Sequence, residues 1–311
     1  MKPNHPPLRA AVRPTTFLEP ERLSQKLGAR VLLASETFQH TGSFKFRAAY
    51  HVAATVSQQR LLTASSGNFG QALAWACRLL GKSCQVVMPL TSAQVKVEAV
   101  REYGGVVELL DVAVKSRSQR VAELAESDPE AYVASPYDDP LVIAGNATLG
   151  VELAKRFPAP DSCDFILAPV GGGGLTAGLI TGLAQENCRV PMVGVEPVLA
   201  NDFARSLRAG RLLANDVEPQ TLADGVRTLS VGQHNWPILR SGLQDIVEVS
   251  EDHIREAVRL LFLLANLKVE PTGALGVAAL LARPELFRER KVCCVVSGGN
   301  VDAQTFARLI E

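Results

Sequence analysis

Residues 164–178, DFILAPVGGGGLTAG, join an apolar run to four consecutive glycines and the start of a helical pattern. A short apolar run that ends in turn residues and leads into a helix predicts a strand, turn and helix unit. Four glycines in a row cost much backbone entropy, which is tolerated mainly where a side chain would keep something from touching the backbone. Because the N–H groups at a helix start favour anions, we expect a phosphate at this turn.

The same alternation of strand and helix extends in both directions along the chain. The apolar runs are RLLTAS, CQVVMP, VVELL, AYVAS, PMVGVEP, DIVEVS and KVCCVVS. Helical patterns lie near residues 68–80, 92–103, 114–127, 175–187, 199–209, 251–265 and 273–282. Apolar strands that alternate with helices indicate parallel-rich sheets flanked by helices on both faces. The sequence therefore predicts an α/β fold with two lobes.

The composition limits the classes of function. The chain has 311 residues, of which 47% are hydrophobic and 21% charged, enough for a large core. Lys plus Arg and Asp plus Glu are equal at 32 each, so we expect no nucleic-acid partner and no membrane surface as a partner. The N-terminus lacks an apolar stretch of signal-peptide length, and no run reads as a membrane span, which predicts a cytoplasmic protein.

The spacing of cysteine and histidine argues against a metal centre built from those residues. The six cysteines lack CxxC spacing, and the five histidines are scattered. Cys293 and Cys294 would point to opposite faces of a strand. We therefore expect free thiols rather than disulfides or zinc.

Two further turns and one lysine have residue types suited to chemistry. SSGNFG at residues 65–70 and SGGN at residues 297–300 follow predicted strands, at whose carboxyl ends such sheets bind ligands. Lys45 lies between Phe44 and Phe46, after a small hydroxyl-rich turn. A desolvated lysine amine has a lowered pKa and can attack a carbonyl to give a Schiff base. The alternative is a turn that caps a helix, with the rings in the core and the amine in solvent.

The glycine turn alone also allows a nicotinamide enzyme. Gly172, Gly174 and Ala177 match the G-x-G-x-x-G/A pattern of dinucleotide-binding folds, and Glu196 lies where a ribose-binding acid belongs. An NAD-dependent dehydrogenase would explain this segment. It leaves the other glycine turns and Lys45 unexplained.

Seven segments together resemble one known family. SFKFR, SSGNFGQA, the tetraglycine turn, GVEP, ADGVRTLSVG, EPTGALGVAAL and SGGNVD occur in the order and approximate spacing of the pyridoxal-phosphate (PLP) dependent threonine/serine dehydratases, which include serine racemases. The resemblance extends from about Thr15 to the C-terminus. It implies the fold type II of PLP enzymes, similar to tryptophan synthase β, with PLP between two domains. The large domain would comprise residues 1–50 and 136–311, and the small domain residues 51–135.

The resemblance implies a role for each motif in holding PLP. Lys45 would form the internal aldimine and then serve as the base for the Cα proton. Asn68 would hydrogen-bond the ring hydroxyl, and Ser297 would face the pyridine nitrogen. The phosphate would be held by backbone N–H groups of four residues. These are Gly171, Gly172, Gly173 and Gly174.

Two serines of the SSGN motif belong to the implied substrate site. Ser65, together with Asn68, would lie near the substrate carboxylate. Ser66 would carry a second proton on the face opposite Lys45, which would permit racemisation. A purely structural role for Ser66, as the cap of the following helix, is compatible with the same position.

The chain departs from the family pattern at two places. Phe69 stands where the family usually has His, and Asn146-Ala147 stands where it has Gln-Gly. Because Phe69 cannot donate a hydrogen bond, the substrate pose and the preference for serine over larger β-hydroxy amino acids stay open.

The resemblance also implies a divalent metal site. Glu196, the main-chain carbonyl of Ala200, and Asp202 fit the spacing of the metal-activated members. Oxygen ligands of this kind suit Mg²⁺, Mn²⁺ or Ca²⁺. The alternative is that both acids are ordinary polar groups at a loop and helix start.

The sequence as a whole predicts a PLP-dependent dehydratase, an ammonia-lyase that converts L-threonine and L-serine to the 2-oxo acid and ammonia. Alternatives within the same chemistry are an amino acid racemase and a hydroxyaspartate ammonia-lyase. A PLP-binding scaffold or amino acid sensor is a non-enzymatic alternative. We expect a small-molecule amino acid substrate and a homodimer. With eleven residues after Asn300, we expect no C-terminal regulatory domain.

Overall fold

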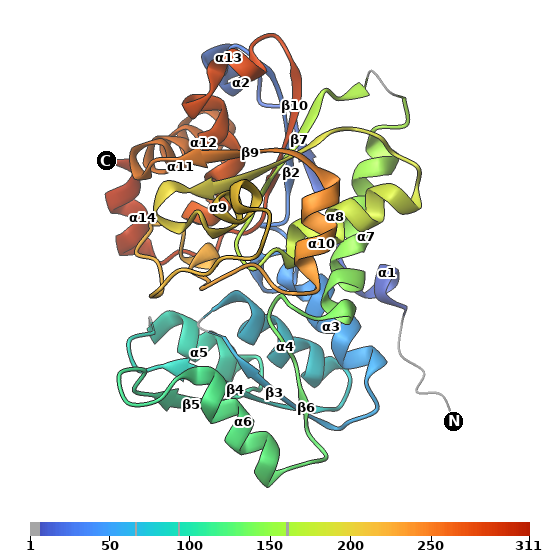
Figure 1. Cartoon of the computed structure of the whole chain (residues 1–311), viewed down its shortest axis with the longest axis vertical. Helices are drawn as coiled ribbons and strands as arrows, with labels where there is room; N and C mark the ends of the chain where they lie inside the picture. Colours follow the sequence, from blue (N-terminus) through green and yellow to red (C-terminus); the bar gives the residue numbers. More distant parts are fainter. Residues whose placement is uncertain (1–6, 66, 93, 160–161) are drawn as a thin grey trace.

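The strands of the protein form two sheets, in the upper and lower parts of Figure 1. The structure is a computed structural model that describes residues 7–65, 67–92, 94–159 and 162–311. The six-stranded sheet has the order β1-β2-β10-β7-β8-β9, and the four-stranded sheet has the order β5-β4-β3-β6. The recorded pairings are parallel except that of β1 with β2. The strands are β1 Thr16–Leu18, β2 Arg30–Ser35, β3 Arg60–Ala64, β4 Ser83–Pro89, β5 Val106–Leu110, β6 Tyr132–Val133, β7 Phe165–Pro169, β8 Met192–Pro197, β9 Leu243–Val249 and β10 Lys291–Val296.

Helices connect these strands. The α-helices are α1 Leu8–Ala11, α2 Glu21–Leu27, α3 Lys45–Thr55, α4 Asn68–Leu79, α5 Gln94–Glu102, α6 Arg117–Ser127, α7 Pro140–Arg156, α8 Gly174–Gln185, α9 Asp202–Ala209, α10 Asn235–Gly242, α11 Glu251–Ala265, α12 Leu275–Ala282, α13 Pro284–Phe287 and α14 Ala303–Ile310. Short 3₁₀ turns are η1 His40–Gly42, η3 Val198–Ala200, η4 Asp224–Val226 and η5 Pro271–Ala274. Among the helices described, none is long and apolar enough to cross a membrane.

Both faces of the six-stranded sheet are covered by helices. One face packs against α2, α11, α12 and α14, and the other packs against α7 and α8. Cys294 belongs to the first of these cores and Cys293 to the second, as their neighbouring positions on β10 require. All six cysteines are free thiols. The predicted α/β fold with parallel-rich, helix-covered sheets is confirmed.

The four-stranded sheet has a core of its own. Residues of α3, α4 and α5 pack on one face of it, and Val121 of α6 packs on the other. Its four strands all fall within residues 51–135, the predicted small domain. The domain boundaries themselves stay a prediction, and α3 extends across the first of them.

The longest helix, α7, is absent from the sequence prediction. Its glycines, Gly145 and Gly150, lower the intrinsic helix propensity. Tertiary packing needs them, because a Cβ at Gly145 would lie 2.7 Å from the Cα of Ala48, and one at Gly150 would lie 2.5 Å from the carbonyl oxygen of Leu179. The predicted helix near 199–209 begins at Asp202 instead, after the 3₁₀ turn η3.

A buried arginine holds the start of α3 in place. Arg47 is fully buried, and its guanidinium contacts Glu36 through Nε at 2.7 Å and Glu152 through Nη1 at 2.7 Å. The same group donates to the hydroxyls of Thr15 at 3.0 Å and Thr148 at 3.2 Å. Arg47 therefore joins α3 to the end of β2, to the N-terminal segment and to α7. A guanidinium can make this set of bonds because its donors form a rigid planar fork.

We predict that Arg47→Met lowers the free energy of unfolding by about 3–5 kcal/mol, because it leaves the buried Glu36 carboxylate without its counter-ion. Urea unfolding measures the change. The control is Arg60→Met. The Arg60 side chain is 59% exposed, and its guanidinium pairs with Asp128 at 3.0 Å. That variant should lose no more than about 1 kcal/mol. Equal losses in the two variants would contradict the role of Arg47.

Candidate active site

The predicted functional residues converge where the two sheets face each other. The glycine turn follows β7, the SGGN turn follows β10, and Ser65 follows β3. Residues before Lys45 pair with the SGGN turn through a bridge between Ser43 and Gly298. The Lys45 amine donates to the carbonyl oxygen of Pro136 at 2.7 Å. Carboxyl ends of parallel strands thus line one common region, as the fold rule for ligand sites expects.

Lys45 is the first residue of α3 and has an apolar surrounding. Its Nζ lies 5.0 Å from the ring centroid of Phe44 and 5.8 Å from that of Phe69. Burial lowers the pKa of the Lys45 amine to about 8, against the opposing influence of Glu270. The amine is therefore far closer to its neutral, nucleophilic form at neutral pH than an ordinary lysine.

The two phenylalanines that flank Lys45 in the sequence lie differently in the structure. The Phe44 ring lies 5.0 Å from Lys45 Nζ, whereas the Phe46 ring packs against His40 at 4.8 Å and Tyr50 at 5.8 Å, and the Phe69 ring lies near the amine. The turn before Lys45 does not cap the helix, because the N-cap is Phe44 and it makes no side-chain cap bond. The alternative interpretation is right that the rings of Phe44 and Phe46 are buried, but the expected cap bond is absent at this helix start and the Lys45 amine bonds to the Pro136 carbonyl.

The turn before Lys45 is held by the SGGN turn. Thr41 has a φ of 59°, a left-handed value that is uncommon for a β-branched residue. Its carbonyl accepts a hydrogen bond of 2.8 Å from the Asn300 amide, and the N–H of Phe44 donates to the carbonyl of Ser297 at 3.0 Å. A Cβ at Gly42 would collide with Asn300. These contacts fix Lys45 relative to the end of β10.

The four glycines form a tight turn at the start of α8. All are buried, and Gly173 has a φ of 88°. A Cβ at Gly172 would collide with the ring of Tyr137, and one at Gly171 would lie 2.8 Å from the Cα of Val226. The Gly172 carbonyl accepts bonds from Gly232 and from the Asn235 amide. Within the described ranges, no protein acceptor is recorded for the N–H groups of the four glycines, so they are free to bind an anion.

Ser297 places a lone hydroxyl at the end of β10. The residue is 1% exposed, and its Oγ has no hydrogen-bond partner within the described ranges. Buried hydroxyls normally have partners, so this one suits a ligand atom. An unpartnered hydroxyl, a turn with free N–H groups and a lysine of lowered pKa together fit the pyridine ring, the phosphate and the aldehyde of PLP.

Asn68 and Ser65 flank the start of α4. The Asn68 amide donates to the two carboxylate oxygens of Glu270 at 2.8 and 3.1 Å, and its oxygen accepts from Asn300 at 2.8 Å. Ser65 Oγ accepts from the N–H groups of Gly67 at 3.3 Å and Gly70 at 3.1 Å, and so stabilises the beginning of this helix. Ser66 lies outside the described residues.

Glu270 is a site residue that the sequence analysis missed. It is 2% exposed, and burial followed by the nearby Asp224 raises its pKa to about 7. The signal was present in EPTGALGVAAL, where a single acid precedes a long apolar stretch. An acid in such a position is either paired or functional.

The predicted metal ligands lie together but already have partners. The Glu196 carboxylate accepts from the N–H groups of Phe203 at 3.1 Å and Ala204 at 2.9 Å, and Asp202 accepts from the N–H of Val231 at 2.9 Å. Burial and then Asp202 raise the pKa of Glu196 well above its usual value. Ala200 is buried beside them in η3. The described residues contain no cluster of three or more His, Cys, Asp or Glu suited to a metal, and the predicted set has two acids.

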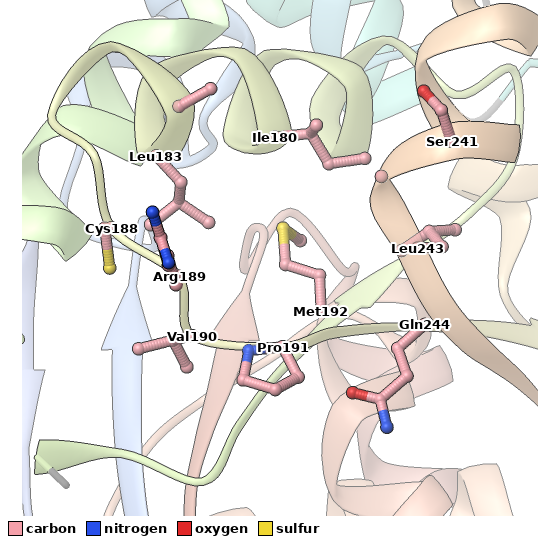
Figure 2. Close-up of a pocket in the computed structure, with 12 residues that line it drawn as sticks. Ile180, Leu183, Cys188, Arg189, Val190, Pro191, Met192, Ser241, Leu243 and Gln244 are labelled. Atoms are coloured by element: carbon pink, nitrogen blue, oxygen red, sulfur yellow. The ribbon is translucent and has the colours of Figure 1, made fainter. Parts of the chain in front are cut away.

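A cavity elsewhere on the molecule is unrelated to these residues. It has a volume of ≈ 360 Å³ and lies between the end of α8 and the first residues of β8 and β9, with Ile180, Met192 and Leu243 in its wall (Figure 2). Arg189 is the one charged residue in its lining. Because it adjoins the amino ends of these strands, it lies at the opposite edge of the sheet from the glycine turn.

Comparisons with known proteins agree with this geometry. A family model described as "Pyridoxal-phosphate dependent enzyme" matches residues 8–298. An L-threo-3-hydroxyaspartate ammonia-lyase of Pseudomonas sp is 37% identical over 93% of this chain and 90% of its own length. The serine racemase of Homo sapiens is 35% identical over 96% of this chain and 89% of its own length. The L-threonine ammonia-lyase of Geobacter sulfurreducens is 35% identical over 98% of this chain and 75% of its own length.

Solved structures give the same result. A threonine deaminase of T.th. has a TM-score of 0.87 and 42% identity, covering 95% of this chain and 97% of that one. Maize serine racemase has a TM-score of 0.89 and 29% identity, and the match covers 97% of this chain and 94% of the maize chain. The family model matched at residues 8–298 covers both Lys45 and the glycine turn, and so it favours PLP over the nicotinamide alternative. The chain belongs to the family of pyridoxal-phosphate dependent enzymes.

Proposed function

We propose that this protein is a PLP-dependent ammonia-lyase that dehydrates L-threonine and L-serine to the 2-oxo acid and ammonia. The observation that carries the proposal is Lys45, an amine of lowered pKa that follows directly on a hydrogen bond from Phe44 to the Ser297 carbonyl and lies 5.8 Å from the Phe69 ring at the start of α4. Similarity to proteins named threonine ammonia-lyase and threonine deaminase supports this choice of reaction. We also propose a cytoplasmic homodimer with neither nucleic acid nor membrane as a partner.

The residues that would hold PLP follow from the site. Lys45 would bind its aldehyde carbon, Asn68 its ring hydroxyl and Ser297 its ring nitrogen. The N–H groups of Gly171, Gly172, Gly173 and Gly174 would bind its phosphate. When bound, PLP supplies an electron sink that makes loss of the Cα proton possible. A hydroxyl at Ser297, in place of a carboxylate, would not favour a protonated ring nitrogen, and this would favour loss of the β-hydroxyl over transamination.

The chain's own groups then have defined tasks. Lys45 would take the Cα proton, and its lowered pKa favours the neutral amine that this step needs. The rings of Phe44 and Phe69, 5.0 and 5.8 Å from the amine, would limit the access of water to it. Ser65 and Asn68 would orient the substrate carboxylate.

We predict that Lys45→Ala lowers turnover of L-threonine by at least about 10²–10⁴-fold, since it removes both the cofactor anchor and the base. Borohydride reduction of the wild type followed by peptide mapping should place the pyridoxyl group on Lys45. Circular dichroism should show an intact fold. Lys155→Ala, at an exposed position on α7, is the control and should retain labelling and activity. A pyridoxyl group on another lysine would refute the assignment.

A divalent metal at Glu196, Asp202 and the Ala200 carbonyl is a further part of the proposal. Burial raises the pKa values of both carboxylates, and repulsion from Asp202 adds to the shift of Glu196. A cation would offset both effects. We predict that a chelator lowers the melting temperature and activity, and that Mg²⁺ or Mn²⁺ restores them, because an ion that binds only the folded state stabilises it.

The matched variants for the metal are Glu196→Gln and Glu123→Gln. The first should remove the response to chelator. The second alters an acid of α6 that pairs with Arg120 at 3.0 Å and should keep the response. A metal-free preparation with the same melting temperature before and after addition of Mg²⁺, Mn²⁺ or Ca²⁺ would eliminate the site.

Racemisation is a second candidate activity, favoured by the similarity to serine racemases. If Ser66 delivers a proton on the face opposite Lys45, Ser66→Ala should stop inversion and leave elimination from the L-substrate largely intact. Coupled oxo acid assay and chiral chromatography give the ratio of the two reactions. Ser57→Ala, at an exposed serine, is the control. An unchanged ratio in Ser66→Ala would mean that another group serves the second face.

A further inference from the structure

The ring of Phe69 forms part of the wall around the Lys45 amine. Phe69 is the second residue of α4 and is 1% exposed. Its ring centroid lies 5.8 Å from Lys45 Nζ, and the ring of Phe44 lies 5.0 Å from the same atom. Phe69 stands where the family resemblance leads one to expect a histidine. An apolar residue at this position is therefore a departure of this chain from the family pattern.

The position of Phe69 brings it within reach of a substrate. A base that takes the Cα proton must come within about 2.6–3.2 Å of its target. A ring whose centroid is 5.8 Å from that base is close enough to contact groups attached to Cα. The ring can neither donate nor accept a conventional hydrogen bond, so it favours a methyl group and disfavours a charged one.

The charged groups near Phe69 reinforce this preference. Glu270 is an acid that accepts two bonds from Asn68, the residue directly before Phe69. Lys96 is a cation beside the SSGN turn. Its Nζ would lie 3.5 Å from a Cβ added at Gly67. Its amine already forms an ion pair with Asp224.

Two further cations, Arg117 and Arg227, also have protein partners. Arg117 of α6 pairs with Glu218 of the opposite lobe at 3.2 Å. Arg227 donates from Nε to the carbonyl of Thr221 at 2.9 Å. A substrate with a second carboxylate would meet an apolar ring, a buried acid and cations that already donate to protein groups. Burying that carboxylate without a counter-ion is strongly unfavourable.

We propose that Phe69 makes this site selective for β-hydroxy amino acids with a neutral side chain, above all threonine, and closes it to β-hydroxyaspartate. The inference rests on the proposed dehydratase function and specifies its substrate class. Relatives named for hydroxyaspartate and relatives named for threonine match this chain about equally well. The residue beside the amine distinguishes between these substrates.

The test compares kcat/KM for L-threonine, L-serine and L-threo-3-hydroxyaspartate on the holoenzyme. In the wild type we expect threonine to exceed serine by about 10-fold, from one additional buried methyl group, and to exceed hydroxyaspartate by at least about 10²-fold. Phe69→His should lower the threonine to hydroxyaspartate ratio by about 10-fold or more. Phe69→Gln is a second polar variant in case the first does not fold. Phe69→Leu stays apolar and should keep the ratio.

A binding measurement separates this inference from the proposed function. L-2-aminobutyrate and L-aspartate lack the β-hydroxyl and cannot be dehydrated. We expect 2-aminobutyrate, but not aspartate, to raise the melting temperature of the wild type, and aspartate to raise that of Phe69→His. If no amino acid is turned over, the proposed function fails, and these shifts still decide the side-chain preference.

Two outcomes would overturn the inference. One is a wild type that uses hydroxyaspartate as well as threonine. In that case Lys96→Met, which removes the cation beside Gly67, should abolish the hydroxyaspartate activity if Lys96 rather than Phe69 sets the preference. The other is a substrate ratio that is the same in the wild type and in the folded polar variants of Phe69.

Discussion

The buried ion pair of Arg47 with Glu36 is the interaction on which the rest of the site depends. Arg47 lies two residues after Lys45, and its guanidinium also contacts Glu152 of α7. These bonds attach the first turn of α3 to the end of β2 and to the longest helix. A buried charge without its partner is costly, so the pair permits few other placements of this turn. The position of the Lys45 amine follows from it.

The site combines an apolar centre with charges that are largely paired. Phe44 and Phe69 surround the Lys45 amine, and burial lowers its pKa. Further out, two ion pairs join the two lobes, Lys96 with Asp224 and Arg117 with Glu218. Gly171, Gly172 and Gly174, where a Cβ would collide, and Gly173, with its positive φ, leave backbone N–H groups at the start of α8 for an anionic cofactor. A neutral substrate side chain fits this distribution of charge better than an anionic one.

Much of this protein is determined by its sequence alone. Apolar runs that alternate with helical patterns predict the two parallel-rich sheets, and seven motifs in order predict the family, because local patterns record strand, helix and turn directly. Lys45 and Ser297 are predicted as site residues in the same way, because each lies within one of these seven motifs. Helix α7 is not predicted, since its glycines serve packing against other helices rather than helix propensity.

The partners of the site residues were decided only by the tertiary structure. Phe69 rather than Phe46 lies beside the amine, and Glu270 binds Asn68 from 202 positions away. Burial of Lys45 and Glu270, and hence the direction of their pKa shifts, also arises only when the two lobes meet. The physical reason is that desolvation and hydrogen bonding depend on which surfaces touch, and no single stretch of the chain contains both surfaces.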